Sequence, residues 1–102
     1  MFYHTVHFWL RPDLSDADRA ALVAAAKGLG ESPHVASCRV GVPAGTDREV
    51  VDNSYDVQLL CTFETSADHD AYQSPADAVH ANFIETYKTF WTRVLIYDSI
   101  DA

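Results

Sequence analysis

The stretch YQSPADAVHANFIETYKTFWTRVLIYD, residues 72–98, decides the fold of this chain. Its first part predicts a helix, because mostly apolar side chains recur at spacings of three and four residues on one face: His80, Phe83, Ile84, Tyr87 and Trp91. Its last part predicts a strand over about residues 92–99, because every second side chain falls on one face, as Val94, Ile96 and Asp98 do. One ionisable group, His80, therefore lies in an otherwise apolar stripe directly before a strand.

Other segments alternate as strands do. Residues 2–10 direct one set of side chains to one face: Phe2, His4, Val6, Phe8 and Leu10. Residues 55–63 do the same with Val57, Leu59, Cys61 and Phe63. A further strand is predicted over residues 35–42. Since the opposite face of residues 2–10 also carries apolar side chains, we expect helices on one side of the sheet and a second subunit on the other.

Capping residues predict where the helices begin. Ser15 is typical of an N-cap, and an alanine-rich helix follows it through Leu29. Thr65 or Ser66 caps a short second helix, and Pro75 begins the long third one. The chain therefore has three predicted helices, with the last two close together in sequence.

The order of elements is β-α-β-β-α-β, with the second helical region split in two and a mobile surface loop over residues 43–54. This order is typical of a ferredoxin-like α+β domain, in which a four-stranded antiparallel sheet carries its helices on one face. Residues 1–102 are expected to form this one domain. The apolar far face predicts a homodimer that packs through the sheet.

Composition and charge exclude several classes of protein. The formal net charge is −8 and the seven Lys and Arg residues are scattered singly, which argues against nucleic acid and anionic membranes as partners. The sequence has no transmembrane run and its N-terminus does not read as a signal peptide, so a cytoplasmic location is expected. Cys38 and Cys61 each lie in a strand-like run and are expected to be reduced core residues.

Several short motifs together give the chain a family likeness. They are Tyr3-His4-Thr5-Val6, the Ser32-Pro33 turn, Val40-Gly41, Thr62-Phe63-Glu64, and Tyr72 with His80, Phe83 and Tyr87. With these motifs the chain resembles the Dabb family, the stress-responsive dimeric α/β-barrel domains. Its last stretch, from Phe90 to Asp98, resembles a polyketide cyclase of that family. The resemblance covers nearly the whole chain and implies a dimeric α/β barrel.

The resemblance also implies a site. His80 and Tyr72 match the catalytic histidine and tyrosine of the cyclase, and no cofactor is expected. Positions that line or support its pocket are matched by His4, Trp91, Val94, Ile96 and Asp98. The same cavity wall is expected to include Val6, Phe8 and Phe83. The segment between Tyr72 and His80 lacks one family histidine and is two residues longer, which changes the spacing of the pair. Family pocket positions are taken by Leu22, Val23 and Ala26 in the first helix and by Val57 in place of a histidine, so a different ligand is expected.

Two interpretations of these side chains remain open. A neutral imidazole with a reference pKa of ~6.5 can take a proton next to a carbonyl, while a phenol with a pKa of ~10 donates to the developing oxyanion. In the alternative, His80 bonds a backbone carbonyl and the Tyr72 hydroxyl lies at the surface. His4 and Asp98 are expected to be neighbours on adjacent strands, as a ligand contact or as a buried pair that closes the sheet.

A metal site is not expected from residue spacing. His4 and His7 lie on opposite faces of one strand. His69, between Asp68 and Asp70, is predicted to belong to a solvated helix patch, so no cluster of three ligands can be assembled.

The function expected from these residues is the binding of a small apolar or aromatic molecule in a cavity between sheet and helices. One hypothesis is a cofactor-free polyketide cyclase or lyase with His80 as the base. A second is a non-catalytic structural or stress-related dimer. A third is a cofactor-free monooxygenase of the related dimeric ferredoxin-like type. The fold by itself does not choose among them.

Overall fold

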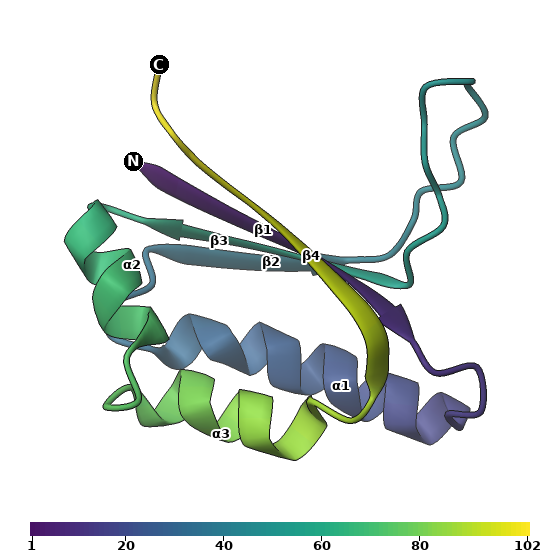
Figure 1. Cartoon of the computed structure of the whole chain (residues 1–102), viewed down its shortest axis with the longest axis horizontal. Helices are drawn as coiled ribbons and strands as arrows, with labels where there is room; N and C mark the ends of the chain where they lie inside the picture. The colour runs from purple at the N-terminus through teal and green to yellow at the C-terminus, as the bar shows by residue number, and fades with distance from the viewer.

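Four antiparallel strands form one sheet in the order β2-β3-β1-β4, and the helices cover one of its faces (Figure 1). The computed structural model describes residues 1–102. Its elements are β1 (Phe2–Leu10), α1 (Asp16–Gly28), the short 3-10 helix η1 (Leu29–Glu31), β2 (Ser37–Gly41), β3 (Val57–Phe63), α2 (Ser66–Gln73), α3 (Ala78–Tyr87) and β4 (Trp91–Ile100). This is the predicted ferredoxin-like arrangement. None of the helices has the length and apolar character needed to span a membrane.

Strand β1 lies between β3 and β4, and its register places the polar side chains of the helix-covered face. His4 lies opposite Cys61 on β3 and opposite Asp98 on β4. Because side chains alternate along a strand, Val6 and Phe8 share the face of His4. All three are buried, which confirms the predicted orientation of residues 2–10.

Side-chain caps fix the first turns of the three α-helices. The Ser15 hydroxyl accepts from the Asp18 N–H at 3.0 Å, and the Thr65 hydroxyl accepts from the Asp68 N–H at 3.1 Å, so Thr65 is the cap of α2. The Asp77 carboxylate caps α3 by accepting from the His80 N–H at 3.1 Å.

The prediction that Pro75 begins the long helix is wrong. Pro75 lies in the turn before α3, because the helix starts where the Asp77 side chain can satisfy its free N–H groups. Trp91 is likewise the first residue of β4 and does not belong to the helical stripe of His80. The helix ends at Tyr87, where a turn follows in which the Phe90 N–H donates to the Tyr87 carbonyl at 2.8 Å.

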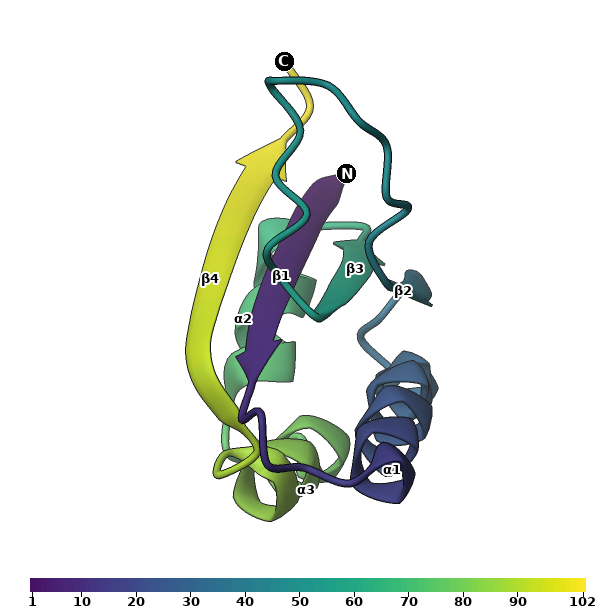
Figure 2. The same cartoon turned by 90° about the vertical axis from the view of Figure 1, so that its right-hand side faces the viewer.

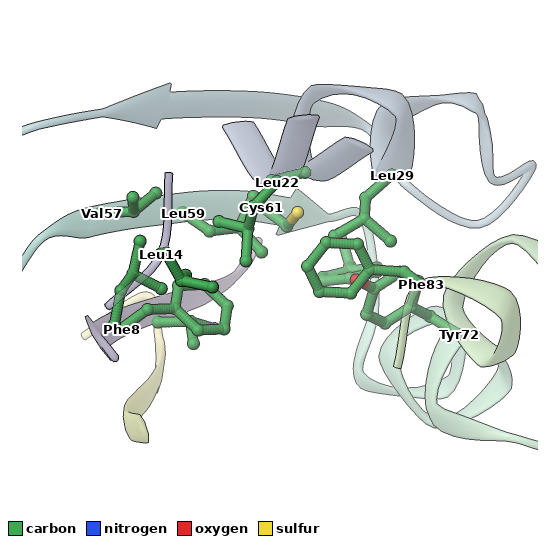
Figure 3. Close-up of a cluster of buried hydrophobic side chains, with 13 residues drawn as sticks. Phe8, Leu14, Leu22, Leu29, Val57, Leu59, Cys61, Tyr72 and Phe83 are labelled. Carbon is green, nitrogen blue, oxygen red and sulfur yellow. The ribbon is translucent and has the colours of Figure 1, made fainter. Parts of the chain in front are cut away.

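The core fills the space between the sheet and the helices (Figure 3). Leu22 and Ala26 on α1 are fully buried in it, as are Cys61 and Phe63 on β3. Cys61 is the direct cross-strand partner of the half-buried Cys38 on β2, and both thiols are free. A hydrogen bond from the Cys61 thiol lowers the pKa of Cys38 to about 7.

The far face of the sheet carries no helix. It presents side chains that alternate with the buried set, among them His7 and Trp9 on β1 and Tyr97 on β4. The irregular segment between β2 and β3 rises beside this face (Figure 2) and touches it at its end, where the Trp9 indole N–H donates to the Ser54 hydroxyl at 3.2 Å. The far face is therefore partly exposed and partly apolar.

Candidate functional site

A cavity of about 150 Å³ lies between the sheet and the helices α2 and α3. Ten of its thirteen lining residues are hydrophobic, so it favours an apolar ligand. Nine of the ten predicted site residues line it: His4, Val6, Phe8, Tyr72, His80, Phe83, Trp91, Val94 and Ile96. Asp98 does not line it. Sequence reasoning missed four lining residues, Leu29, Leu59, Gln73 and Ile84.

Tyr72 and His80 are brought together at the cavity by the turn between α2 and α3. Tyr72 is in the last turn of α2 and His80 in the first turn of α3, and their ring centroids lie 4.4 Å apart. A hydrogen bond fixes this turn to the segment after η1, because the buried Asp77 carboxylate accepts from the Ser32 hydroxyl at 2.6 Å. The longer segment between Tyr72 and His80 therefore still lets the two rings meet.

The surroundings of the two rings differ from the alternative in which His80 bonds a backbone carbonyl and the Tyr72 hydroxyl lies at the surface. The His80 imidazole makes no hydrogen bond within the chain, and so it is not held by a backbone carbonyl. Tyr72 is only 1% exposed, and its hydroxyl lies in the interior beside the Cys61 thiol. Both side chains line the cavity, and neither follows that alternative.

Burial sets the protonation states of the pair. It lowers the pKa of His80, an effect that Asp77 opposes and that the nearby His4 and His69 reinforce. Burial also raises the pKa of Tyr72, with the Cys61 thiol and the Asp77 carboxylate adding to the effect. At neutral pH the imidazole is therefore a neutral acceptor and the phenol a neutral donor.

His80 also forms part of the wall between the cavity and the surface. Together with Gln73 and Ile84 it lines a second, shallow groove on the outside of the turn before α3. The exposed side chains of Val94 and Ile96 on β4 mark another open side of the cavity. The cavity therefore borders the surface at two places.

His4 and Asp98 form the predicted cross-strand pair. The distance between His4 Nδ1 and Asp98 Oδ1 is 2.6 Å, and the His4 ring lies 6.2 Å from the Tyr72 ring between centroids. His4 is buried, whereas Asp98 is partly exposed at the sheet edge. Asp98 therefore orients His4, and His4 is the member of the pair that faces the cavity.

The prediction that His69 belongs to a solvated patch is wrong. Its ring stacks on Phe2 with centroids 4.2 Å apart and lies 5.0 Å from the His4 ring. The expectation that no three metal-ligating groups meet is also wrong, because His4, His69 and Asp98 offer ligand atoms that all lie within 4.8 Å of one another. Spacing along the sequence cannot reveal this cluster, since its members come from α2, β1 and β4. Burial lowers the pKa of His69.

Comparison with known proteins identifies the family of this chain. Residues 2–101 match the Dabb family, described as the stress-responsive A/B barrel domain. The chain belongs to the Dabb family. No functionally curated protein matches it by sequence.

Solved structures share the fold of this Dabb domain at low sequence identity. The hydroxynitrile lyase of Passiflora edulis superposes with a TM-score of 0.82 at 17% identity, over 99% of this chain and 93% of that one. A Dabb family protein of Mesorhizobium loti with a ferredoxin-like fold gives 0.75 at 20% identity, over 99% and 96%. A dimeric ferredoxin-like protein of unknown function from Thermobifida fusca gives 0.74 at 14% identity, over 96% and 88%.

Proposed function

We propose that this Dabb domain binds a small aromatic carbonyl compound, or its adduct, in the cavity and catalyses its cleavage or condensation. The observation that carries the proposal is the contact of the Tyr72 and His80 rings, 4.4 Å apart, on the wall of one apolar cavity. A base and a neutral hydroxyl donor side by side are the two groups that proton transfer at a carbonyl compound requires.

The volume of the cavity limits the ligand. A space of 150 Å³ is the size of an engineered apolar cavity that binds benzene, so it suits one ring and little more. A long polyketide chain would extend out past Val94 and Ile96. We therefore favour a lyase acting on a single-ring substrate over a cyclase acting on a long chain.

The chemistry can be written for an aromatic cyanohydrin. Neutral His80 takes the hydroxyl proton of the substrate, the bond between the carbinol carbon and the nitrile breaks, and the aldehyde forms. Cyanide leaves with the electron pair and receives the proton back from the imidazolium. Tyr72 donates its O–H to the substrate oxygen throughout. Support for this class comes from the shared fold of the Passiflora edulis hydroxynitrile lyase.

The test separates turnover from binding. Mandelonitrile is the turnover probe, with benzaldehyde release measured by absorbance, and benzyl alcohol is the binding probe in calorimetry. We expect His80→Gln and Tyr72→Phe each to lower kcat/KM by about 10²–10⁴-fold. His34→Gln is the control, because His34 is a half-buried histidine that does not line the cavity.

Binding of benzyl alcohol without turnover would support the cavity as a binding site and refute the catalytic role. Absence of both would refute the proposal altogether. Turnover that is unchanged in His80→Gln would show that the reaction occurs without this pair.

We also propose that two chains pack through the far face of the sheet. Leu60, Leu95 and Tyr97 lie on this face without a covering helix, and His7 Nδ1 is buried there without a hydrogen-bond partner in the chain. A second copy can supply that partner and cover the apolar side chains. The Thermobifida fusca structure of the same fold is described as dimeric.

Sedimentation equilibrium tests the dimer. We expect a dimer at micromolar concentration and a shift to monomer in Leu95→Asp, with Val50→Asp on the exposed loop as the control. A wild-type chain that remains monomeric would contradict the proposal.

A further inference from the structure

Beside the cavity, three side chains from three elements converge on one point. His4 comes from β1, His69 from α2 and Asp98 from β4. Helix α2 lies beneath the end of the sheet where β1 begins and β4 ends (Figure 1). One ligand atom from each of the three residues lies within 4.8 Å of the other two. His4 is buried, His69 is mostly buried and Asp98 is partly exposed, so the cluster connects the interior with solvent.

We propose that His4, His69 and Asp98 bind one divalent transition-metal ion. Two imidazole nitrogens and one carboxylate oxygen are a donor set that suits Zn²⁺, Co²⁺, Ni²⁺ or Fe²⁺. Mg²⁺ and Ca²⁺ prefer oxygen ligands and are disfavoured by the two histidines. The site goes beyond the proposed function, because neither His69 nor Asp98 lines the cavity.

The distances are compatible with such an ion after small side-chain movements. Metal–ligand bonds of ~2.1 Å place two ligands of a tetrahedral ion about 3.4 Å apart. His4 Nδ1 and Asp98 Oδ1 lie 2.6 Å apart, so they would have to separate slightly, and His69 would have to approach. Asp98 is free to move because its side chain is partly exposed at the edge of the sheet. An ion in this position would replace the hydrogen bond between His4 and Asp98.

The other polar contacts of the cluster are long and would not hold His69 away. His69 Nε2 lies 3.5 Å from Gln73 Nε2, and His69 Nδ1 lies 3.9 Å from Asp70 Oδ1. The stacking of His69 on Phe2 holds its ring next to His4. The chain's net charge of −8 also favours the approach of a cation.

The three ligands leave at least one coordination position open, as in catalytic zinc sites. Since His4 faces the cavity, an ion bound to it would lie at the cavity edge. The binding measurement below does not depend on turnover, so it can fail while the proposed function holds, and the reverse is also true.

The test titrates the full chain, without a polyhistidine tag, with Co²⁺ alone and follows the visible absorption of the bound ion. Zn²⁺ is then added as a competitor. We expect one Co²⁺ per chain, displaced by Zn²⁺, and a loss of affinity of more than about tenfold in both His69→Ala and Asp98→Asn, since even outer-shell changes cost 10–100-fold. His34→Ala is the matched histidine control and should bind like the wild type.

Three results would overturn the proposal. They are a wild-type titration without a stoichiometric end point, an unchanged affinity in either His69→Ala or Asp98→Asn, and an equal loss in His34→Ala. Urea unfolding of each variant shows whether it is folded. If His69→Ala does not fold, Asp98→Asn decides the outcome, because asparagine keeps the shape of the side chain.

Discussion

Strands β1 and β4 are neighbours in the sheet, but the same face is buried on one and exposed on the other. Val6 pairs with Ile96, and Phe8 pairs with Val94, so both pairs point toward the helices. Val6 and Phe8 are 4% and 3% exposed, whereas Ile96 and Val94 are 46% and 42% exposed. Periodicity therefore predicts the direction of a side chain, and the position of its strand in the sheet decides whether anything covers it.

The position of β4 in the sheet explains why its row of helix-facing side chains, Val94 and Ile96, is exposed, whereas the corresponding row on β1, Val6 and Phe8, is buried. Strand β4 is the edge strand beside β1, and Figure 2 shows it at one side of the sheet, extending out past the helices. Val94 and Ile96 line the cavity as well as being exposed. The incomplete cover at this edge thus provides an opening to the cavity, while the row on β1 forms its floor.

The largest expected difference between the two rows is in stability. Phe8→Ala should lower the free energy of unfolding by about 3–5 kcal/mol, because it removes a fully buried ring and leaves a void. Val94→Ala removes a half-exposed side chain and should cost less than about 1 kcal/mol. Urea unfolding followed by circular dichroism measures both. Equal losses in the two variants would show that β4 is covered in solution.

The opening at β4 can also be tested by ligand binding. Val94→Trp adds bulk at the opening, so we expect it to weaken the binding of benzyl alcohol with little effect on stability. Val50→Trp, which adds the same ring on the exposed loop, is the control. Unchanged binding in Val94→Trp would show that the ligand enters elsewhere, and the groove beside Gln73 and His80 would then be the next candidate.

A smaller loss of stability is expected when the hydrogen bond between His4 on β1 and Asp98 on β4 is weakened. Asp98→Asn removes a carboxylate from the 2.6 Å contact with His4 and should lower the free energy of unfolding by about 1–2 kcal/mol, since hydrogen bonds to charged groups contribute more than neutral ones and partial exposure reduces the effect. Glu85→Gln, in an exposed pair with Lys88 on α3, should leave the urea midpoint unchanged. An unchanged urea midpoint in Asp98→Asn would show that the pair of His4 and Asp98 contributes nothing to the stability of the fold.

Much of the fold could be predicted because local rules and tertiary packing agree along most of the chain. Alternation in residues 2–10 gave the buried face of β1, and the Ser15 cap gave the start of α1. Register could also be anticipated at one point, since the first and last strands of this topology are neighbours and His4 meets Asp98. The start of α3 could not be predicted, because Pro75 and Asp77 are both suited to the start of a helix. The hydrogen bond from Ser32 to Asp77, which the sequence does not reveal, favours Asp77.

The candidate site was predictable only in part. His80 and Tyr72 were found through a family likeness, and their contact depends on a turn whose path the sequence does not dictate. His69 was missed because its neighbours Asp68 and Asp70 indicate a solvated surface. Its burial comes from the way α2 crosses the end of the sheet and meets Phe2, a contact between segments more than sixty residues apart.

The smallest effect concerns pH and again separates covered from exposed side chains. Burial lowers the pKa of His80 and of His69 in the folded chain, so protonation favours the unfolded chain. The stability that these two neutral histidines contribute is therefore fully present above their pKa in the unfolded chain, ~6.5. It is lost as the pH falls below that value toward their lower pKa values in the folded chain. We expect the urea midpoint to decrease between pH 7 and pH 5, and to decrease less in His80→Asn and in His69→Asn than in the wild type. His34→Asn, outside the cavity and the cluster, is the control. A midpoint that is flat over this range, or a slope that neither variant changes, would show that water reaches both rings freely and that the covered face of the sheet is as open as the edge at β4.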